Sequence, residues 1–249
     1  MRRAALLLAV ACGAMALLSA VGPGGRAAAV TPADAAVLAE RGRTLFAEGC
    51  ATCHGADLRG RPGLGPSLRG AGAAAADFYL STGRMPLDDP TDQPLRTEPA
   101  YPRRDIDALV AYVGSFGGPA IPRVDAARGD VARGMRAFTE RCAGCHQVVA
   151  RGGIVTGGSV PPLDQSTAVQ IAEAVQIGPY LMPRFSTAQL DAGRLADVAA
   201  YIAYARHPDD RGGWGIGHIG PIPEGMVAWL LAGLVLLGVA RIIGERSPT

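Results

Sequence analysis

The sequence has few cysteines, and it leaves none over for a framework of disulfide bonds. Five of its 249 residues are cysteine. Four of them form two copies of the pattern C-x-x-C-H, which contain Cys50, Cys53, Cys142 and Cys145. The fifth, Cys12, lies in an apolar N-terminal stretch. Because both pairs are already placed within a repeated motif, the cysteines indicate cofactor chemistry.

Lysine is absent, so arginine supplies all 24 basic side chains. The formal net charge is only +2, which gives no reason to expect a nucleic acid as partner. Aromatic residues make up 5% of the chain, and alternating runs of β-branched residues are missing. These absences argue against a β-sheet protein and predict an all-α fold.

Both ends of the chain are apolar. Residues 1–30 begin with two arginines, continue with an uncharged run and end in small residues, which is typical of an export signal. The run is also long enough to stay as an N-terminal anchor, so we expect either a signal peptide or an anchor here.

The C-terminal stretch 224–244 is apolar over the length of a membrane span, and we predict a transmembrane helix there. Arg241 and Arg246 follow the apolar run, which favours a cytoplasmic C-terminus. The bulk of the chain is then expected on the extracytoplasmic side of the cell membrane.

The two C-x-x-C-H motifs lie within a longer internal repeat. "RGRTLFAEGCATCH" (41–54) aligns without a gap on "RGMRAFTERCAGCH" (133–146), and an amphipathic helix is predicted toward the end of each copy. In the first copy we expect Asp105 to cap the start of that helix. The predicted organisation is a signal peptide or anchor, two helical domains, a linker and a membrane helix, at 1–30, 34–118, 119–207, 208–223 and 224–244.

C-x-x-C-H is the attachment sequence of c-type haem. The two thiols form thioethers to the porphyrin, and the histidine, His54 or His146, ligates the iron. A bare C-x-x-C is also compatible with a thiol redox pair or half of a zinc site. The histidine that follows directly, twice and on an exported chain, favours two covalently bound haem c groups.

The sixth iron ligand decides between electron transfer and substrate chemistry. Met85 and Met182 each follow a motif histidine and precede a proline, which prevents a helix from continuing through the methionine. We therefore predict Met85 as a ligand of the first iron and Met182 as a ligand of the second. His207 and His218 are the other histidines of the chain and are expected to be surface residues.

Both domains resemble class I cytochrome c. That family has a glycine and an aromatic residue before the first haem cysteine, matched by Gly42 with Phe46 and by Gly134 with Phe138. The resemblance also implies that a proline carbonyl accepts a hydrogen bond from the motif histidine. Pro66 fits in the first domain, and Pro161, with Pro162 as an alternative, fits in the second.

The whole chain resembles a narrower family, the dihaem cytochrome c subunit of the actinobacterial menaquinol–cytochrome c reductase, or cytochrome bcc complex. The resemblance rests on "GPSLRGAGAAAADFYLSTGRMP", "CAGCHQVVARGGIVTGGSVPPL", "GPYLMPRFS" and "GIGHIGPIPEGMVAWLLAGL". It implies cytochrome b and a Rieske protein as partners, with electrons passing on to an aa3-type cytochrome c oxidase. The chain would then be the electron-transfer subunit of an enzyme complex, with no substrate site of its own.

Two other functions stay open at this point. A dihaem peroxidase would need an iron with a free sixth position, and the two Met-Pro pairs argue against that. An anchored dihaem cytochrome c serving a periplasmic dehydrogenase, or donating to an oxidase outside a bcc complex, would share the same motifs. The Pro-rich segment after Met85 is expected to be a solvated loop, with docking of a cationic partner by Asp88, Asp89 and Asp92 as the alternative.

Overall fold

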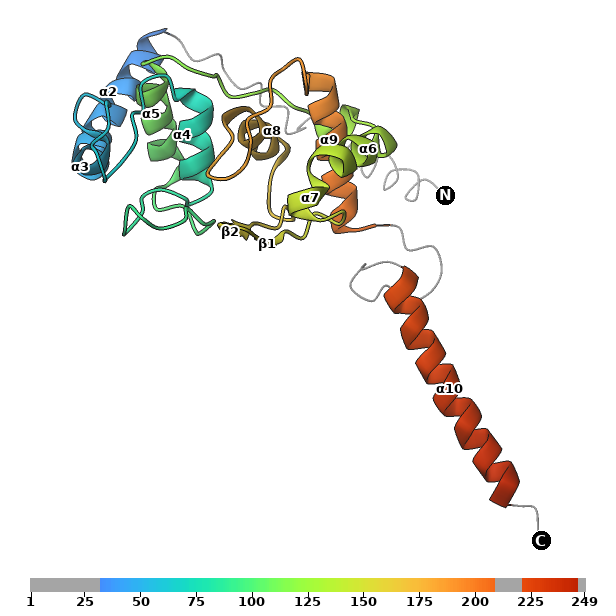
Figure 1. Ribbon diagram of the computed structural model, residues 1–249. Helices are drawn as coiled ribbons and strands as arrows, with labels where there is room; N and C mark the ends of the chain where they lie inside the picture. Colours follow the sequence, from blue (N-terminus) through green and yellow to red (C-terminus); the bar gives the residue numbers. More distant parts are fainter. Residues whose placement is uncertain (1–31, 209–220, 246–249) are drawn as a thin grey trace, which may run out of the picture. The chain divides into compact units, whose positions relative to one another are not determined.

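The computed structural model describes residues 32–208 and 221–245 of the chain (Figure 1). The predicted signal peptide or anchor, Cys12 and His218 lie outside these residues. The first domain contains the helices α2 (Pro32–Gly49), α3 (Ala51–His54), α4 (Gly72–Ser81) and α5 (Arg103–Gly114). The second contains η1 (Ala126–Arg128), α6 (Val131–Arg141), α7 (Ala143–His146), β1 (Gly153–Val155), β2 (Gly158–Val160), α8 (Ala168–Ile177) and α9 (Ala192–Arg206).

In the first domain α2 packs closely against α5. A Cβ atom added to Gly42 would lie 2.6 Å from the carbonyl carbon of Ala108 and 2.8 Å from Cβ of Tyr112, so only glycine fits. Next to this contact the buried ring of Phe46 packs on Tyr112, with 5.5 Å between ring centroids. The glycine lets the two backbones touch, and the aromatic pair fills the space beside them.

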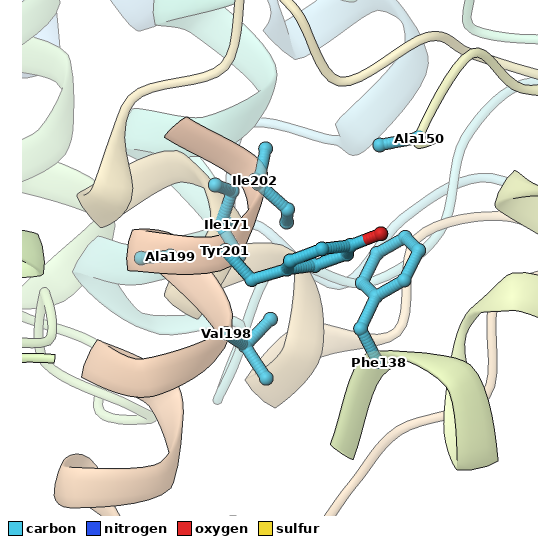
Figure 2. Packing of buried hydrophobic residues seen from close by; sticks show 7 residues of the cluster. All are labelled: Phe138, Ala150, Ile171, Val198, Ala199, Tyr201 and Ile202. Carbon is cyan, nitrogen blue, oxygen red and sulfur yellow. The ribbon is translucent and has the colours of Figure 1, made fainter. Parts of the chain in front are cut away.

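The second domain repeats this contact between α6 and α9. A Cβ on Gly134 would lie 2.5 Å from the carbonyl carbon of Asp197 and 2.9 Å from Cβ of Tyr201. Phe138 is fully buried against Tyr201, with ring centroids 5.3 Å apart (Figure 2). The sequence repeat therefore corresponds to a repeated helix crossing.

Ion pairs flank both crossings. Arg133 Nε donates to Asp197 Oδ2 at 2.8 Å in the second domain, and Arg41 Nε donates to Asp105 Oδ1 at 2.8 Å in the first. The prediction that Asp105 caps its helix was wrong. α5 begins at Arg103 with Pro102 at the cap position, so Asp105 falls in the first turn and pairs with Arg41 instead.

A small antiparallel hairpin interrupts the helices of the second domain. Strands β1 and β2 pair Gly153 with Val160 and Val155 with Gly158. No strand was predicted here, because strands of three residues are too short to show an alternating pattern. The fold is otherwise helical, as predicted.

The segment after Met85 is not simply a solvated loop, contrary to the expectation. Gln93 Nε2 donates to the carbonyl oxygen of Ser159 at 2.6 Å, and the Ser159 N–H donates back to Gln93 Oε1 at 3.0 Å. Arg96 also reaches the second domain, where it donates to the carbonyl oxygen of Gln165 at 3.1 Å. The prediction failed because these contacts depend on how two domains pack, which local composition does not encode. Asp88, Asp89 and Asp92 are exposed, as expected, and so are most other residues of this segment.

The C-terminal helix α10 (Pro221–Glu245) matches the predicted membrane span. Its segment Glu224–Glu245 has a mean hydropathy of 2.3 and is long and apolar enough to cross a membrane. None of the apolar window is buried against the rest of the protein. Arg241 pairs with Glu245 at 3.0 Å near the end of this helix. A core helix of a soluble protein would be buried, so the exposed apolar surface favours the membrane interpretation.

The helix crossing gives a first testable prediction. Gly134→Ala should lower the free energy of unfolding of the second domain by about 1–3 kcal/mol, because the added methyl overpacks the contact with α9. Guanidinium denaturation of the detergent-solubilised chain, followed by circular dichroism, measures this change.

Gly144→Ala is the matched control, since nothing lies within 4 Å of its added Cβ and the first motif has Thr52 at the same place. Equal stabilities of the two variants would contradict the proposed role of Gly134.

Candidate haem sites

The first C-x-x-C-H motif continues directly from helix α2. Cys50 N–H donates to the carbonyl oxygen of Phe46 at 2.9 Å, and His54 N–H donates to the carbonyl oxygen of Cys50 at 3.0 Å. The motif thus forms a helical turn that is anchored to the buried Phe46. The crossing of α2 and α5 at Phe46 therefore fixes where both thiols and the imidazole lie.

A proline carbonyl accepts a hydrogen bond at each motif histidine. His54 Nδ1 lies 2.9 Å from the carbonyl oxygen of Pro66, and His146 Nδ1 lies 3.1 Å from that of Pro161. When Nδ1 donates to a carbonyl, the neutral ring keeps Nε2 free as a metal ligand. Of the two prolines considered for the second domain, Pro161 makes this contact.

Two glycines that the sequence analysis did not single out shape these loops. Gly60 N–H donates to the carbonyl oxygen of His54 at 2.8 Å, and Gly152 N–H donates to that of His146 at 3.0 Å. Both have positive φ, at 80° and 70°. A Cβ on Gly152 would lie 2.6 Å from the carbonyl carbon of Pro161, so glycine is needed for the chain to approach the histidine. The signal was present as a repeated Arg-Gly pair at equal distance from each motif histidine.

His146 is buried in the second domain, with 9% of its surface exposed. Burial lowers the pKa of its imidazole, and the hydrogen bond to Pro161 opposes this only in part. The ring is therefore neutral near pH 7, which is the form that binds a metal.

The half-buried thiols of Cys50 and Cys142 are also in their neutral form. Partial burial raises the pKa of each to about 11. The second cysteine of each motif adds to the effect, and at Cys142 the charge of Arg141 opposes it. All four motif cysteines are free of disulfide bonds. Because the thiolate is the form that ligates a metal, thiols with a raised pKa are poorly suited to a thiolate metal site.

A cavity of about 190 Å³ adjoins the second motif. The predicted ligand Met182 lines this cavity together with Cys142, Cys145, His146 and Pro161. Most of the remaining wall is apolar, and Met182 packs against the buried cluster around Leu190 and Leu195. Two thiols, a neutral imidazole and a thioether around one apolar cavity are the donor set that haem c requires, so the residues fit this group.

In the first domain, helix α4 ends at Ser81 and the half-buried Met85 follows shortly after. Its N–H donates to the carbonyl oxygen of Tyr79 at 3.2 Å. A methionine just beyond a helix end fits the predicted loop ligand. Ligation of the first iron by His54 and Met85, and of the second by His146 and Met182, remains a prediction.

Comparisons with known proteins place two cytochrome domains on the chain. The family model "Cytochrome c" matches residues 39–116, and the model "Cytochrome C oxidase, cbb3-type, subunit III" matches residues 129–202. The cytochrome bc1 complex cytochrome c subunit of Corynebacterium diphtheriae is 38% identical over 98% of this chain and 93% of its own length. The subunit of that name from Mycobacterium tuberculosis is 37% identical over 94% of this chain and 90% of its own length.

The chain belongs to the family of cytochrome bc1 complex cytochrome c subunits. This confirms the resemblance drawn from the sequence. It also confirms the predicted fold of two cytochrome c domains with a C-terminal apolar helix. Cytochrome c domains imply covalently bound haem c. A structure of reduced cytochrome c4 from Pseudomonas stutzeri is 22% identical and covers 66% of this chain and 96% of that chain, with a TM-score of 0.24.

The cytochrome c subunit offers a test of the histidine loop. Gly152→Ala should disturb the Pro161 carbonyl and lower the stability of the second domain by about 1–3 kcal/mol through overpacking. It should also lower the fraction of chains with a complete second haem, which intact-protein mass spectrometry measures.

Gly157→Ala is the control, because it has the same kind of backbone, with φ at 90°, but its nearest neighbour is a flexible Leu181 methyl at 3.5 Å. If both variants behaved alike, the backbone strain and not the approach to His146 would be responsible.

Proposed function

We propose that this cytochrome c subunit carries two haem c groups and relays electrons from the Rieske protein of a menaquinol-oxidising bcc complex to an aa3-type cytochrome c oxidase. Bound haem supplies one-electron exchange at iron. The similarity to bc1 complex cytochrome c subunits over nearly the whole chain, with the C-terminal helix included, carries this proposal.

The protein's own residues hold and tune the two irons. Cys50, Cys53, Cys142 and Cys145 would form the thioethers, and the two motif histidines would hold the irons through Nε2. The prolines orient each imidazole through Nδ1. Met85 and Met182 would also ligate the irons, which would leave no free position for a substrate. The subunit thus serves an enzyme complex without a substrate site of its own.

Helix α10 keeps the relay at the cell membrane. Its apolar length supports a membrane span, and Arg241 near its end supports a cytoplasmic C-terminus. The haem domains then lie on the extracytoplasmic side. Cytochrome b and the Rieske protein are the proposed partners, because the similar proteins are named as subunits of the cytochrome bc1 complex.

Removing the thiols of one motif tests the haem count. The double variant Cys142→Ser, Cys145→Ser should lose one haem from the intact mass, whereas the purified wild type should carry two. The equivalent change at Cys50 and Cys53 is the matched control and should remove the other haem. A wild type that carries one haem would contradict the proposal.

Copurification tests the partners. The tagged full-length subunit is extracted in a mild detergent, and the proteins that come with it are identified by mass spectrometry. Cytochrome b, a Rieske protein and oxidase subunits are expected. Recovery with a periplasmic dehydrogenase, or with an oxidase alone, would instead support an anchored donor outside a bcc complex. A variant truncated before Glu224 is the control and should lose these partners.

A further inference from the structure

The cavity beside the second haem motif is lined by residues of both domains. Its second-domain wall contains the motif itself and Met182. The first domain also contributes to the wall, through Phe78, Arg84, Gln93, Pro94 and Arg96. The first domain is therefore part of the second haem site, which the sequence did not indicate.

Arg84 is buried in this wall, with 9% of its surface exposed. One of its Nη atoms donates to the carbonyl oxygen of Pro94 at 2.6 Å, and its guanidinium lies over the Phe78 ring, 5.3 Å from the centroid. Its Nε, however, is buried without a hydrogen-bond partner among the described residues. A buried charged donor without a partner is costly, so this N–H points to a ligand.

Arg96 extends from the same loop onto the second domain. Its guanidinium donates to the side-chain oxygen of Gln170 at 3.3 and 3.4 Å and to the carbonyl oxygen of Gln165 at 3.1 Å. All these acceptors are neutral. Asp164 is close enough to raise the pKa of Arg96, yet burial has the larger effect and lowers it.

The charges around the cavity are unbalanced. Three arginines line it, Arg84, Arg96 and Arg141, and no carboxylate does so among the residues that the structure describes. Arg84 is buried and Arg96 is half-buried, whereas Arg141 is exposed. An anion near Arg84 and Arg96 would balance their like charges.

We propose that Arg84 and Arg96 of the first domain bind the propionate carboxylates of the haem in the second domain. The inference rests on the proposed attachment of haem to Cys142 and Cys145. Haem carries two carboxylates, which match two guanidinium groups in charge and in hydrogen-bonding capacity. The first domain thus completes the second haem site and sets part of its electrostatic environment.

The Arg96→Gln variant of the full-length, detergent-solubilised holoprotein tests this in a potentiometric titration. Loss of a positive charge favours the oxidised iron, which is the more positive form, so the midpoint of the second haem should fall relative to the first. We expect roughly a tenfold change in the electron-transfer equilibrium between the two haems, or about 59 mV for one electron. Met85→His and Met182→His assign the two midpoints, because replacing a methionine ligand lowers the potential of its own haem.

Two control variants separate charge from domain packing. Gln93→Ala removes the hydrogen bonds to Ser159 without changing the charge, and should leave the midpoint in place. Arg96→Lys keeps the positive charge and should retain most of the wild-type midpoint. Resonance Raman spectroscopy gives a second readout, since the propionate bending mode should shift in Arg96→Gln but not in Gln93→Ala.

Three results would overturn the inference. These are unchanged midpoints in Arg96→Gln, the same shift in Gln93→Ala, and a shift confined to the first haem. A wild type that carries two haems together with any of these results would leave the proposed function standing. A wild type without the second haem would refute the proposed function itself.

Discussion

The structure depends on one contact that occurs twice, the touching of two helix backbones at a glycine. Gly134 lies against the carbonyl of Asp197, and Gly42 lies against that of Ala108. At each crossing a buried phenylalanine packs beside the glycine and accepts, through its carbonyl, the N–H of the first motif cysteine. The haem motif therefore begins at a point fixed by the domain core. A small domain gains order from the crossing and further stability from a covalently attached macrocycle.

After each motif the chain folds back and contacts the motif histidine. Glycines at positive φ bring the backbone close to His54 and His146, and the next proline carbonyls accept from their Nδ1 atoms. The buried imidazole of His146 is neutral and held in one orientation, which is what a stable iron ligand needs. An electron carrier benefits from such rigidity, because little has to move when the charge of the iron changes.

Much of this could be predicted from the sequence. The C-x-x-C-H pairs, the ungapped repeat and the two apolar ends are local patterns, and they indicated haem c, two domains and a membrane helix. The docking of Gln93 and Arg96 onto the second domain could not be predicted, since it arises from the packing of two domains. The hairpin at 153–160 was too short for a periodic signal. The start of α5 was misplaced because Asp105 suits a cap as well as an ion pair.

In the proposed function, both irons are fully ligated by the protein and serve electron transfer only. The most direct test is the optical spectrum of the reduced, full-length subunit before and after addition of carbon monoxide. We expect two haems per chain and a spectrum that carbon monoxide leaves unchanged, because methionine is the proposed sixth ligand of each iron. A haem that binds carbon monoxide readily would reveal an open iron and would contradict a purely electron-transferring role.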